Sequence, residues 1–253
     1  MKDSDPTLDA PAHAPHPVLP QYYERPEERR DFVRQMFDRA AGDYDRVERI
    51  AALGSGSRYR RLALLRAGLK PGMRVLDVGA GTGLVTREVL SIVGDSSNVT
   101  GLDPSDAMMR SGLQALPIAL VQGTAERLPF ADSHFDFVSM GFALRHVADL
   151  PAVFREFRRV LRPDGTVCML EITPPENAFS RRLLKLYLGS IVPFASRVLA
   201  RHAETPMLFR YFWDTIEACV PPAQVLEAMQ SAHLDRARRH VEAGMFSEYT
   251  ARR

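Results

Sequence analysis

The sequence contains little cysteine, little tryptophan and no long apolar run, and each shortage excludes a class of protein. Its 253 residues include two cysteines, Cys168 and Cys219, and one tryptophan. Without a Cys-x-x-Cys motif or a histidine pair at ligand spacing, neither a disulfide framework nor a metal site is expected. No apolar run reaches the roughly 18 residues of a membrane-spanning helix. The acidic, proline-rich N-terminus also differs from a secretory signal. We therefore expect a protein of the reducing cytoplasm.

The net charge is also small. The chain has 33 Lys and Arg against 31 Asp and Glu, a formal charge of +2. Its arginines are scattered over predicted helices in company with acidic residues, so no basic stripe indicates a nucleic-acid partner. With 45% hydrophobic residues, a chain of this length can bury one sizeable α/β core but hardly a second. We expect one domain with decorations.

The chain does have a strand, a glycine-rich loop and a helix in direct succession. Residues 75–78 form a short apolar run that is typical of a buried strand, and residues 84–90 have a helical pattern. Between them stand Gly79, Gly81 and Gly83. Glycines let a backbone turn sharply and approach a ligand, and the helix that follows directs its free N–H groups at the loop. The loop predicts a site for a carboxylate, ribose or phosphate.

The spacing of the glycines narrows the choice of ligand. The dinucleotide fingerprint requires glycine where this chain has Leu84, and the P-loop requires a Lys-Ser/Thr pair that does not follow here. Two carboxylates accompany the loop instead. Asp77 lies in the preceding strand, and Asp103 closes the next one, where a carboxylate can accept hydrogen bonds from both ribose hydroxyls. Loop and carboxylates together form a much more specific nucleotide-type signal than the loop alone.

A series of motifs in this order resembles the class I S-adenosylmethionine-dependent methyltransferases. They lie at residues 77–83, 101–103, 125–130, 135–136 and 160–165. Within that superfamily the chain is most similar to the ring C-methyltransferases of ubiquinone and menaquinone synthesis. The segments that carry this closer resemblance are residues 36–45, 141–146 and 209–216.

The resemblance implies an α/β fold. The core is expected to be a doubly wound, Rossmann-like, seven-stranded and mostly parallel sheet with a C-terminal antiparallel hairpin and a helical lid. Residues 1–26 are proline-rich and predict a disordered tail. Residues 27–253 form the methyltransferase domain. Within it residues 27–70 are expected to form an N-terminal helical lid that the sheet itself does not need, and residues 177–219 a helical insertion over the substrate.

The insertion is unusually apolar for a surface cover. Lys185, Gly189 and Pro193 interrupt it, so it does not predict a membrane span. Its composition fits ordinary core packing, the wall of a lipophilic substrate pocket, a homodimer face, or a surface that touches a membrane peripherally. All four interpretations remain open at this point.

The resemblance implies that S-adenosylmethionine is the cofactor, and it assigns residues to each part of that molecule. Asp103 is expected to bind the ribose hydroxyls. Many relatives carry an acid for the adenine amino group where this chain has Thr124, so the backbone N–H of Ala125 is the more secure adenine contact. Tyr44 lies near the cofactor or is a core aromatic. The full cofactor set is Asp77, Gly79, Gly81, Thr82, Asp103, Thr124, Ala125, Gly141 and Tyr44.

Arg145 and His146 are the expected catalytic pair. A ring carbon becomes nucleophilic when a neighbouring hydroxyl loses its proton, and quinone-ring enzymes have an Arg-Asn pair where this chain has Arg145-His146. Arg145 is expected to hold the phenolate. His146, titrating near neutral pH, is expected to take the proton directly or through water. Alternatively His146 only orients its loop, because the pattern Leu-x-His-x-x-Asp also resembles general small-molecule methyltransferases.

The expected activity is methyl transfer to a ring carbon of a quinol or phenol-like aromatic small molecule, lipophilic if the quinol is prenylated. Histidine in place of asparagine at position 146 and the Pro221-Pro222 pair favour an alternative. That alternative is O- or N-methylation of an aromatic or heteroaromatic secondary metabolite. A third interpretation is a cofactor-binding protein without turnover.

Overall fold

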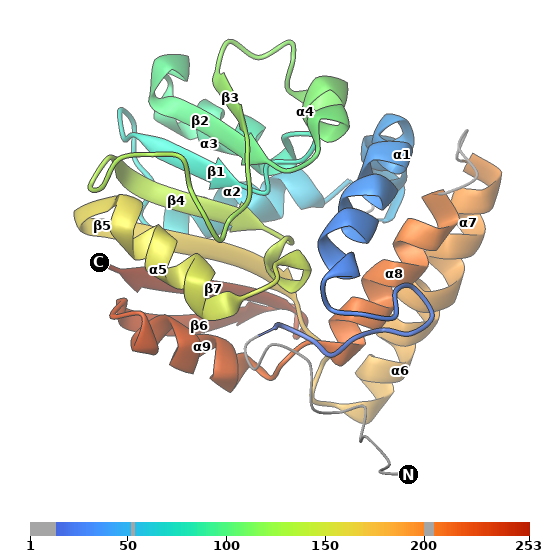
Figure 1. Cartoon of the computed structure of the whole chain (residues 1–253). Coiled ribbons are helices and arrows are strands. Elements are labelled where there is room, and N and C mark those ends of the chain that lie inside the picture. The colour runs from blue at the N-terminus through green and yellow to red at the C-terminus, as the bar shows by residue number, and fades with distance from the viewer. Residues whose placement is uncertain (1–13, 52–53, 200–204) are drawn as a thin grey trace.

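The computed structural model describes residues 14–51, 54–199 and 205–253, which surround one central sheet (Figure 1). The strand order is β3-β2-β1-β4-β5-β7-β6. Strands β1 to β5 pair in parallel, and β7 runs antiparallel to both β5 and β6. This arrangement confirms the mostly parallel seven-stranded sheet and its C-terminal hairpin. The strands are β1 (Val75–Val78), β2 (Val99–Asp103), β3 (Ala119–Gln122), β4 (Phe135–Gly141), β5 (Leu161–Ile172), β6 (Asp235–Glu242) and β7 (Phe246–Arg252).

Helices cover both faces of the sheet, which is why its central strands are almost wholly apolar. Helices α5 and α9 cover one face, and α2 and α3 cover the other. Tyr59 and Leu64 of α2 pack with Val89 and Phe137. Helix α2 therefore completes the doubly wound core, and the expectation that all of residues 27–70 form a lid is wrong for this helix. The bounds are α2 (Gly56–Arg66), α3 (Leu84–Val93), α5 (Leu150–Val160) and α9 (Pro222–Ser231).

A separate helical layer stands beside the carboxyl edge of the parallel strands (Figure 1). It joins α1 with the predicted insertion, and Val33 and Met36 of α1 share a hydrophobic cluster with Leu208 and Tyr211 of α8. Helices from the N-terminal part and from the insertion thus form one layer beside the sheet. Its helices are α1 (Glu28–Ala51), α6 (Ala178–Leu186), the π-helical turn η3 (Tyr187–Ile191), α7 (Val192–Leu199) and α8 (Thr205–Ala218); the remaining helical elements of the described chain are α4 (Asp106–Gly112), η1 (Ser96–Asn98) and η2 (Leu144–His146).

The predicted disordered tail, residues 1–26, includes residues that the structure describes. Residues 1–13 lie outside the described residues, but residues 14–26 pack against the helical layer. Leu19 and Tyr23 are buried with α1 and α8, and the carbonyl oxygen of Pro15 accepts a hydrogen bond from the backbone N–H of Val220. The prediction of disorder is wrong for this part, because two large apolar side chains without periodicity still find a hydrophobic cluster to join.

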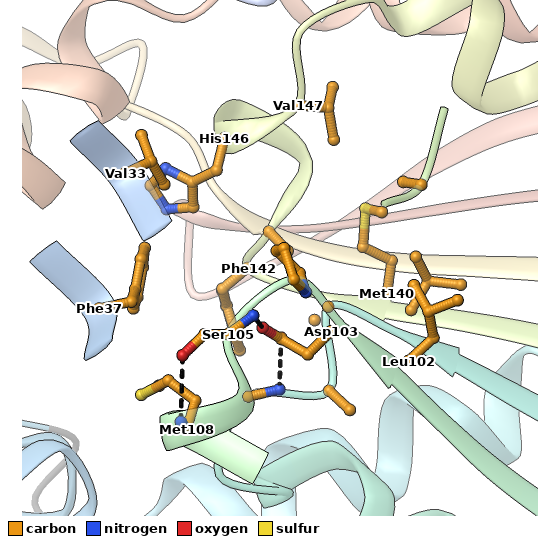
Figure 2. A pocket seen from close by; sticks show the side chains of 18 of the residues that line it. Val33, Phe37, Leu102, Asp103, Ser105, Met108, Met140, Phe142, His146 and Val147 are labelled. Atoms are coloured by element: carbon orange, nitrogen blue, oxygen red, sulfur yellow. Dashed lines mark hydrogen bonds between the residues drawn. The ribbon is translucent and has the colours of Figure 1, made fainter. Parts of the chain in front are cut away.

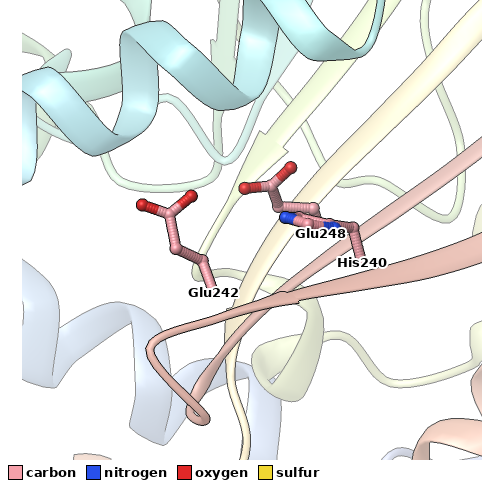
Figure 3. A group of neighbouring side chains, drawn as sticks. All are labelled: His240, Glu242 and Glu248. Carbon is pink, nitrogen blue, oxygen red and sulfur yellow. The ribbon is translucent and has the colours of Figure 1, made fainter.

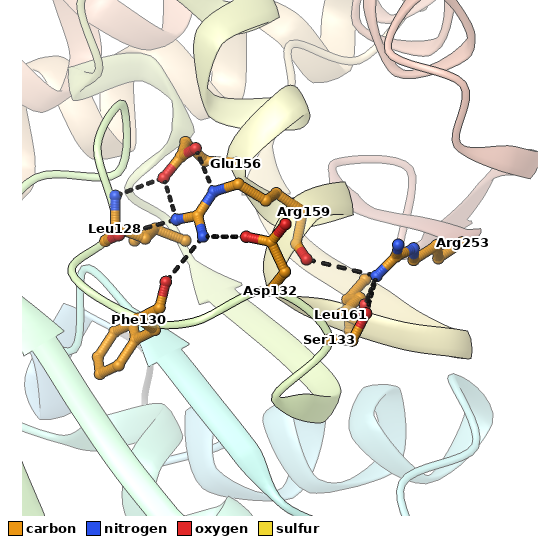
Figure 4. Close-up of polar contacts among 8 residues, drawn as sticks. All are labelled: Leu128, Phe130, Asp132, Ser133, Glu156, Arg159, Leu161 and Arg253. Atoms are coloured by element: carbon orange, nitrogen blue, oxygen red, sulfur yellow. Dashed lines mark hydrogen bonds and ion pairs between the residues drawn. The ribbon is translucent and has the colours of Figure 1, made fainter.

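The loop that follows β3 is fixed by one arginine of α5 (Figure 4). Arg159 donates hydrogen bonds to the carbonyl oxygens of Leu128 and Phe130, at 2.9 and 2.7 Å, and pairs with Asp132 and Glu156. The carboxylate of Glu156 in turn accepts the backbone N–H of Leu128 at 2.7 Å. A guanidinium with five donors in a planar fork suits such a set of acceptors. The network holds the loop at the edge of the ligand pocket.

Candidate functional site

A pocket with about 150 Å³ of water-accessible space lies at the carboxyl ends of the parallel strands, beneath α1 (Figure 2). In an open α/β sheet this is the edge at which ligands bind. Nine of the predicted site residues line it: Tyr44, Gly79, Gly81, Thr82, Asp103, Thr124, Ala125, Gly141 and His146. Asp77 and Arg145, both of which the structure describes, are not among the lining residues.

The wall of the pocket is backbone at two glycines. A Cβ atom at Gly79 would lie 2.7 Å from the Cβ of Ala143, and one at Gly141 would lie 2.4 Å from a methyl group of Val85. Gly79 also has a backbone φ angle of +69°, which residues other than glycine rarely adopt. At both positions packed protein atoms already fill the space that a side chain would need, so only glycine fits there.

Asp103 ends β2 and reaches into the pocket. Its two carboxylate oxygens accept the backbone N–H groups of Gly81 and Ser105, each at 2.8 Å. Burial raises the pKa of Asp103 to about 6, against the lowering effect of those two hydrogen bonds. Asp103 is thus an ionisable acceptor at the point where the sequence predicts a ribose contact.

Asp77 lies below the glycine loop instead of facing the pocket. Its carboxylate accepts hydrogen bonds from the hydroxyls of Thr86 at 2.6 Å and Ser139 at 2.7 Å. Its side chain is fully buried, and burial raises its pKa to about 6. The prediction of a direct cofactor contact is therefore wrong. Asp77 joins α3 and β4 to β1 and so positions the loop.

Helix α1 is tied to the loops that carry the predicted cofactor residues. The hydroxyl of Thr82 donates a hydrogen bond to Asp45, and the hydroxyl of Ser105 donates one to Asp38 at 2.5 Å. Since Ser105 follows Asp103 closely, both halves of the ligand site touch the same helix. Helix α1 therefore contacts both loops, and its role as a lid stays a prediction.

A group of aromatic side chains packs beside the pocket. Tyr44 stands 6.2 Å from Phe37 and 6.4 Å from Phe209, ring centroid to ring centroid. Its burial raises its pKa. Tyr44 is both a pocket residue and a packed aromatic, so the two sequence interpretations of this side chain describe one position. Phe212 closes the same group, 5.4 Å from Phe209.

His146 lies between these rings, and Val33 and Phe37 of α1 point toward it (Figure 2). Its imidazole stacks on Tyr211 at 5.6 Å and meets the edge of Phe37 at 5.3 Å. Both ring nitrogens are buried and have no hydrogen-bond partner among the described residues. Burial, and then the nearby Arg145 and Arg29, lower its pKa well below 6.5. The expectation of titration near neutral pH is therefore wrong, and His146 is a neutral acceptor.

Arg145 points away from the pocket. Its guanidinium pairs with Glu171 of β5 at 2.6 Å, donates to the hydroxyl of Thr215 at 3.2 Å and lies 5.1 Å from the ring centroid of Phe212. Arg29 donates to its carbonyl oxygen at 2.7 Å. The predicted phenolate role is wrong, because the guanidinium is buried against Glu171 and Thr215 and does not line the pocket. Arg145 instead anchors the short helical turn η2 to β5 and α8.

Four arginines that the sequence analysis did not assign also line the pocket: Arg29, Arg30, Arg34 and Arg60. Arginines in company with acidic residues on predicted helices give no sign of a pocket. The spacing of Arg30, Val33, Arg34 and Phe37 on one helix was the available signal, because these positions share a face.

A group of potential metal ligands lies on the antiparallel hairpin β6–β7, beside β5. His240, Glu242 and Glu248 of β6 and β7 place one ligand atom each within 4.8 Å of one another (Figure 3). Arg66 already pairs with both glutamates. The guanidinium supplies the positive charge that two neighbouring carboxylates require, so this group is explained without an ion.

The insertion leaves an apolar face open to solvent. Phe179 and Phe194 are 70% and 68% exposed, and Leu183, Leu186 and Ile191 are about half exposed. Other apolar side chains of the insertion are buried, among them Leu184 and Val192. Core packing thus accounts for only part of its composition. In the described ranges, no helix is long and apolar enough to cross a membrane.

Comparison with known proteins agrees with this geometry. The model of the ubiE/COQ5 methyltransferase family matches residues 24–250. The ubiquinone/menaquinone biosynthesis C-methyltransferase UbiE of Shewanella sediminis is 34% identical over 197 residues, 75% of this chain and 77% of that protein. The protein of the same name from Ectopseudomonas mendocina is 32% identical over 220 residues, 84% of each chain.

Solved structures share the fold at lower identity. A SAM-dependent methyltransferase from Aquifex aeolicus has a TM-score of 0.58 and 18% identity, over 82% of this chain and 97% of that one. Phosphoethanolamine N-methyltransferase 2 of Haemonchus contortus, solved with S-adenosyl-L-methionine, has a TM-score of 0.54 and 16% identity, over 77% and 52% of the two chains.

Proposed function

Since the chain belongs to the ubiE/COQ5 methyltransferase family and is therefore an S-adenosylmethionine-dependent methyltransferase, we propose that it methylates a ring carbon of a quinol or phenol-like acceptor. The observation that carries this proposal is His146, an unpaired neutral imidazole within the described part of the pocket, surrounded by aromatic rings. The curated relatives are named as C-methyltransferases of quinone biosynthesis, which supports the same acceptor class.

The residues of the pocket fit the cofactor. The glycine loop lines the pocket, and the carboxylate of Asp103 is an acceptor for ribose hydroxyls. We assign the methionine end to Gly79, Gly81 and Thr82, the adenine side to Thr124 and Ala125, and the pocket floor to Gly141. Bound there, the cofactor supplies a methyl group on a positively charged sulfur. Positioning and exclusion of water by the protein account for up to about 7–11 kcal/mol in well-oriented systems.

His146 prepares the acceptor for attack. A free ring nitrogen accepts the hydrogen bond of the acceptor's hydroxyl, which draws the proton away and increases electron density in the ring. The ring of the acceptor packs beside Phe37, an aromatic side chain that lines the pocket next to His146. Because burial and Arg145 disfavour the imidazolium, His146 shares the hydroxyl proton in a hydrogen bond and does not keep it. The ring carbon that takes the methyl group loses its own hydrogen as a proton, so the hydroxyl is restored and one proton is released to water overall.

O-methylation is the second candidate, and the same imidazole favours it. A histidine that draws a proton from a phenol leaves a nucleophilic oxygen as well as a nucleophilic ring carbon. The atom that faces the cofactor then decides the product. The family assignment makes the chain an enzyme, so binding without turnover is no longer a candidate.

The test uses cofactor with a labelled methyl group and a panel of quinols, phenols and heteroaromatics. Carbon-bound label in a quinol or phenol product is the expected result, whereas label only on oxygen or nitrogen would replace the proposal with its alternative. In parallel, H146L should lower turnover by about 10²-fold or more, the usual contribution of a general base, with the affinity for S-adenosylhomocysteine within about threefold of wild type. The turnover of H146Q, which retains a hydrogen-bond acceptor, should lie between those of wild type and H146L. A loss of less than about tenfold in H146L would remove the base role.

A lipophilic quinol would be delivered from a lipid surface, and we propose that the exposed face of α6 and α7 touches it. Phe179, Leu183 and Phe194 supply apolar contacts, and Arg182 and Arg197 on the same helices favour anionic headgroups. Contact of this kind is peripheral. A homodimer through the same face is the competing outcome, and a cytoplasmic location stays a prediction.

A further inference from the structure

We propose that Arg60 of α2 binds the carboxylate at the methionine end of S-adenosylmethionine. The inference rests on the cofactor and is independent of the acceptor. Arg60 lines the pocket together with Gly79 and Phe142, although only 5% of the residue is exposed. Its guanidinium carbon lies 5.5 Å from the centroid of the Phe142 ring. An arginine buried this deeply needs an anion to compensate its charge, and Glu48 of α1 supplies one in the protein without ligand.

The direction of the ligand across the sheet leads to this arginine. Asp103 at the end of β2 takes the ribose, and Thr124 and Ala125 after β3 take the adenine. Strand β1 separates β2 from β4, so the rest of an elongated nucleoside extends over β1 toward β4. Phe142 follows β4 directly and brings Arg60 to that side of the pocket.

Arg60 has capacity for a further anion. One terminal nitrogen pairs with Glu48 of α1. Its Nε is buried and, across the described ranges, has no hydrogen-bond partner. A guanidinium has five donors and binds carboxylates best through two parallel hydrogen bonds. Glu48 therefore leaves room for a second carboxylate, and its own pairing shows that a carboxylate can reach this guanidinium.

The other arginines of the pocket lie elsewhere. Arg29 donates to the carbonyl oxygen of Arg145, next to His146, and Arg34 pairs with Asp31 on the exposed side of α1. Both, like Arg30, belong to the N-terminal half of α1, near the acceptor residues, whereas Arg60 enters from α2 and lines the pocket together with Gly79. Of these cations, Arg60 is the one placed for the amino-acid part of the cofactor.

The experiment compares two ligands that differ in the amino-acid part. S-adenosylhomocysteine has the carboxylate, and 5′-methylthioadenosine keeps the adenine and ribose but lacks it. By calorimetry, R60M should weaken S-adenosylhomocysteine about 10- to 100-fold, the range of a hydrogen bond to a charged group. Binding of methylthioadenosine should stay within about threefold of wild type. R60K keeps the positive charge but not the planar, two-pronged guanidinium. It should therefore weaken S-adenosylhomocysteine by an intermediate factor and leave methylthioadenosine binding unchanged.

A purely structural role for Arg60 predicts a different pattern. If the arginine only joins α2 to α1, R60M should weaken both ligands equally or neither, and either result overturns the proposal. E48Q is the matched control, because it breaks the same ion pair from the other side. It should leave methylthioadenosine binding unchanged and S-adenosylhomocysteine binding unchanged or tighter. Should R60M fail to fold, the ligand selectivity of R60K decides the question. These binding experiments contain no methyl acceptor. A result that overturns the role of Arg60 would therefore not affect the proposal of ring methylation.

Discussion

Replacing Asp103 with asparagine should abolish the pH dependence of nucleoside binding. The carboxylate is buried at the pocket wall, and burial raises its pKa to about 6. Ribose hydroxyls donate most strongly to the ionised carboxylate, which offers acceptor sites only. A hydrogen bond to a charged group contributes about 1.5–3 kcal/mol, so D103N should weaken 5′-methylthioadenosine by about tenfold or more at pH 8.

The pKa sets the size of the pH effect. With a pKa of about 6, Asp103 in the free protein is almost fully ionised at pH 8, half ionised at pH 6 and about one-tenth ionised at pH 5. If only the ionised form binds, the dissociation constant of the wild type rises about tenfold between pH 8 and pH 5. D103N should give a flat profile that meets the wild-type curve near pH 5.

The same shift has a consequence for stability. Because the folded pKa of about 6 lies above the reference value of 3.8, ionised Asp103 lowers the free energy of unfolding of the ligand-free protein. The loss amounts to about 3 kcal/mol above pH 7 and disappears as the pH falls from about 6 to about 4. D103N should therefore be at least as stable as wild type at pH 8, which separates weaker binding from unfolding.

Calorimetry with 5′-methylthioadenosine at pH 5, 6, 7 and 8 makes the measurement, because this ligand lacks the titrating amino-acid group. D106N is the matched control. It removes the same charge from the half-exposed start of α4, where Asp106 pairs with Arg110, and should keep the wild-type profile. A flat wild-type profile, or a D103N profile that still rises toward pH 5, would refute the reasoning.

Three further changes probe the pocket wall, the lid and the exposed face. G141A should weaken cofactor binding about tenfold, because the new methyl group would lie 2.4 Å from Val85, and adding V85A should restore most of it; no recovery would contradict the steric explanation. D45A removes the acceptor of the Thr82 hydroxyl and should speed amide exchange across α1 by several-fold, and unchanged exchange would show that the contact does not hold the lid. L183E should reduce flotation with anionic phospholipid vesicles, whereas L120E at the far edge of the sheet should not; equal flotation of both variants, or a dimer that L183E dissociates, would count against membrane contact.

Local patterns made the sheet and its cofactor edge predictable. The apolar run before Gly79, the glycines themselves and the carboxylate of Asp103 each need only their own neighbours to take their positions. The starts of helices α4 and α5 also depend only on neighbouring residues. The side chains of Ser105 and Asp149 accept the backbone N–H groups of Met108 and Ala152, at 3.1 and 2.9 Å, as capping residues do.

The acceptor side could not be predicted in the same way, because it depends on distant partners. Arg145 is drawn away from the pocket by Glu171, 26 residues further along the chain. The pKa of His146 falls because of burial and because Arg29 and Arg145 approach it, and no local pattern reports either effect. Likewise the sequence around Leu19 gives no sign that α1 and α8 form a cluster that it can join.

The location of the cofactor is tested most directly by a crystal structure of the protein with S-adenosylhomocysteine. The account predicts ribose hydroxyls within hydrogen-bond distance of the Asp103 carboxylate, adenine beside Thr124 and Ala125, and sulfur facing the His146 side of the pocket. Ligand density in any other cleft, or a ribose that leaves Asp103 bonded only to the backbone of Gly81 and Ser105, would contradict it.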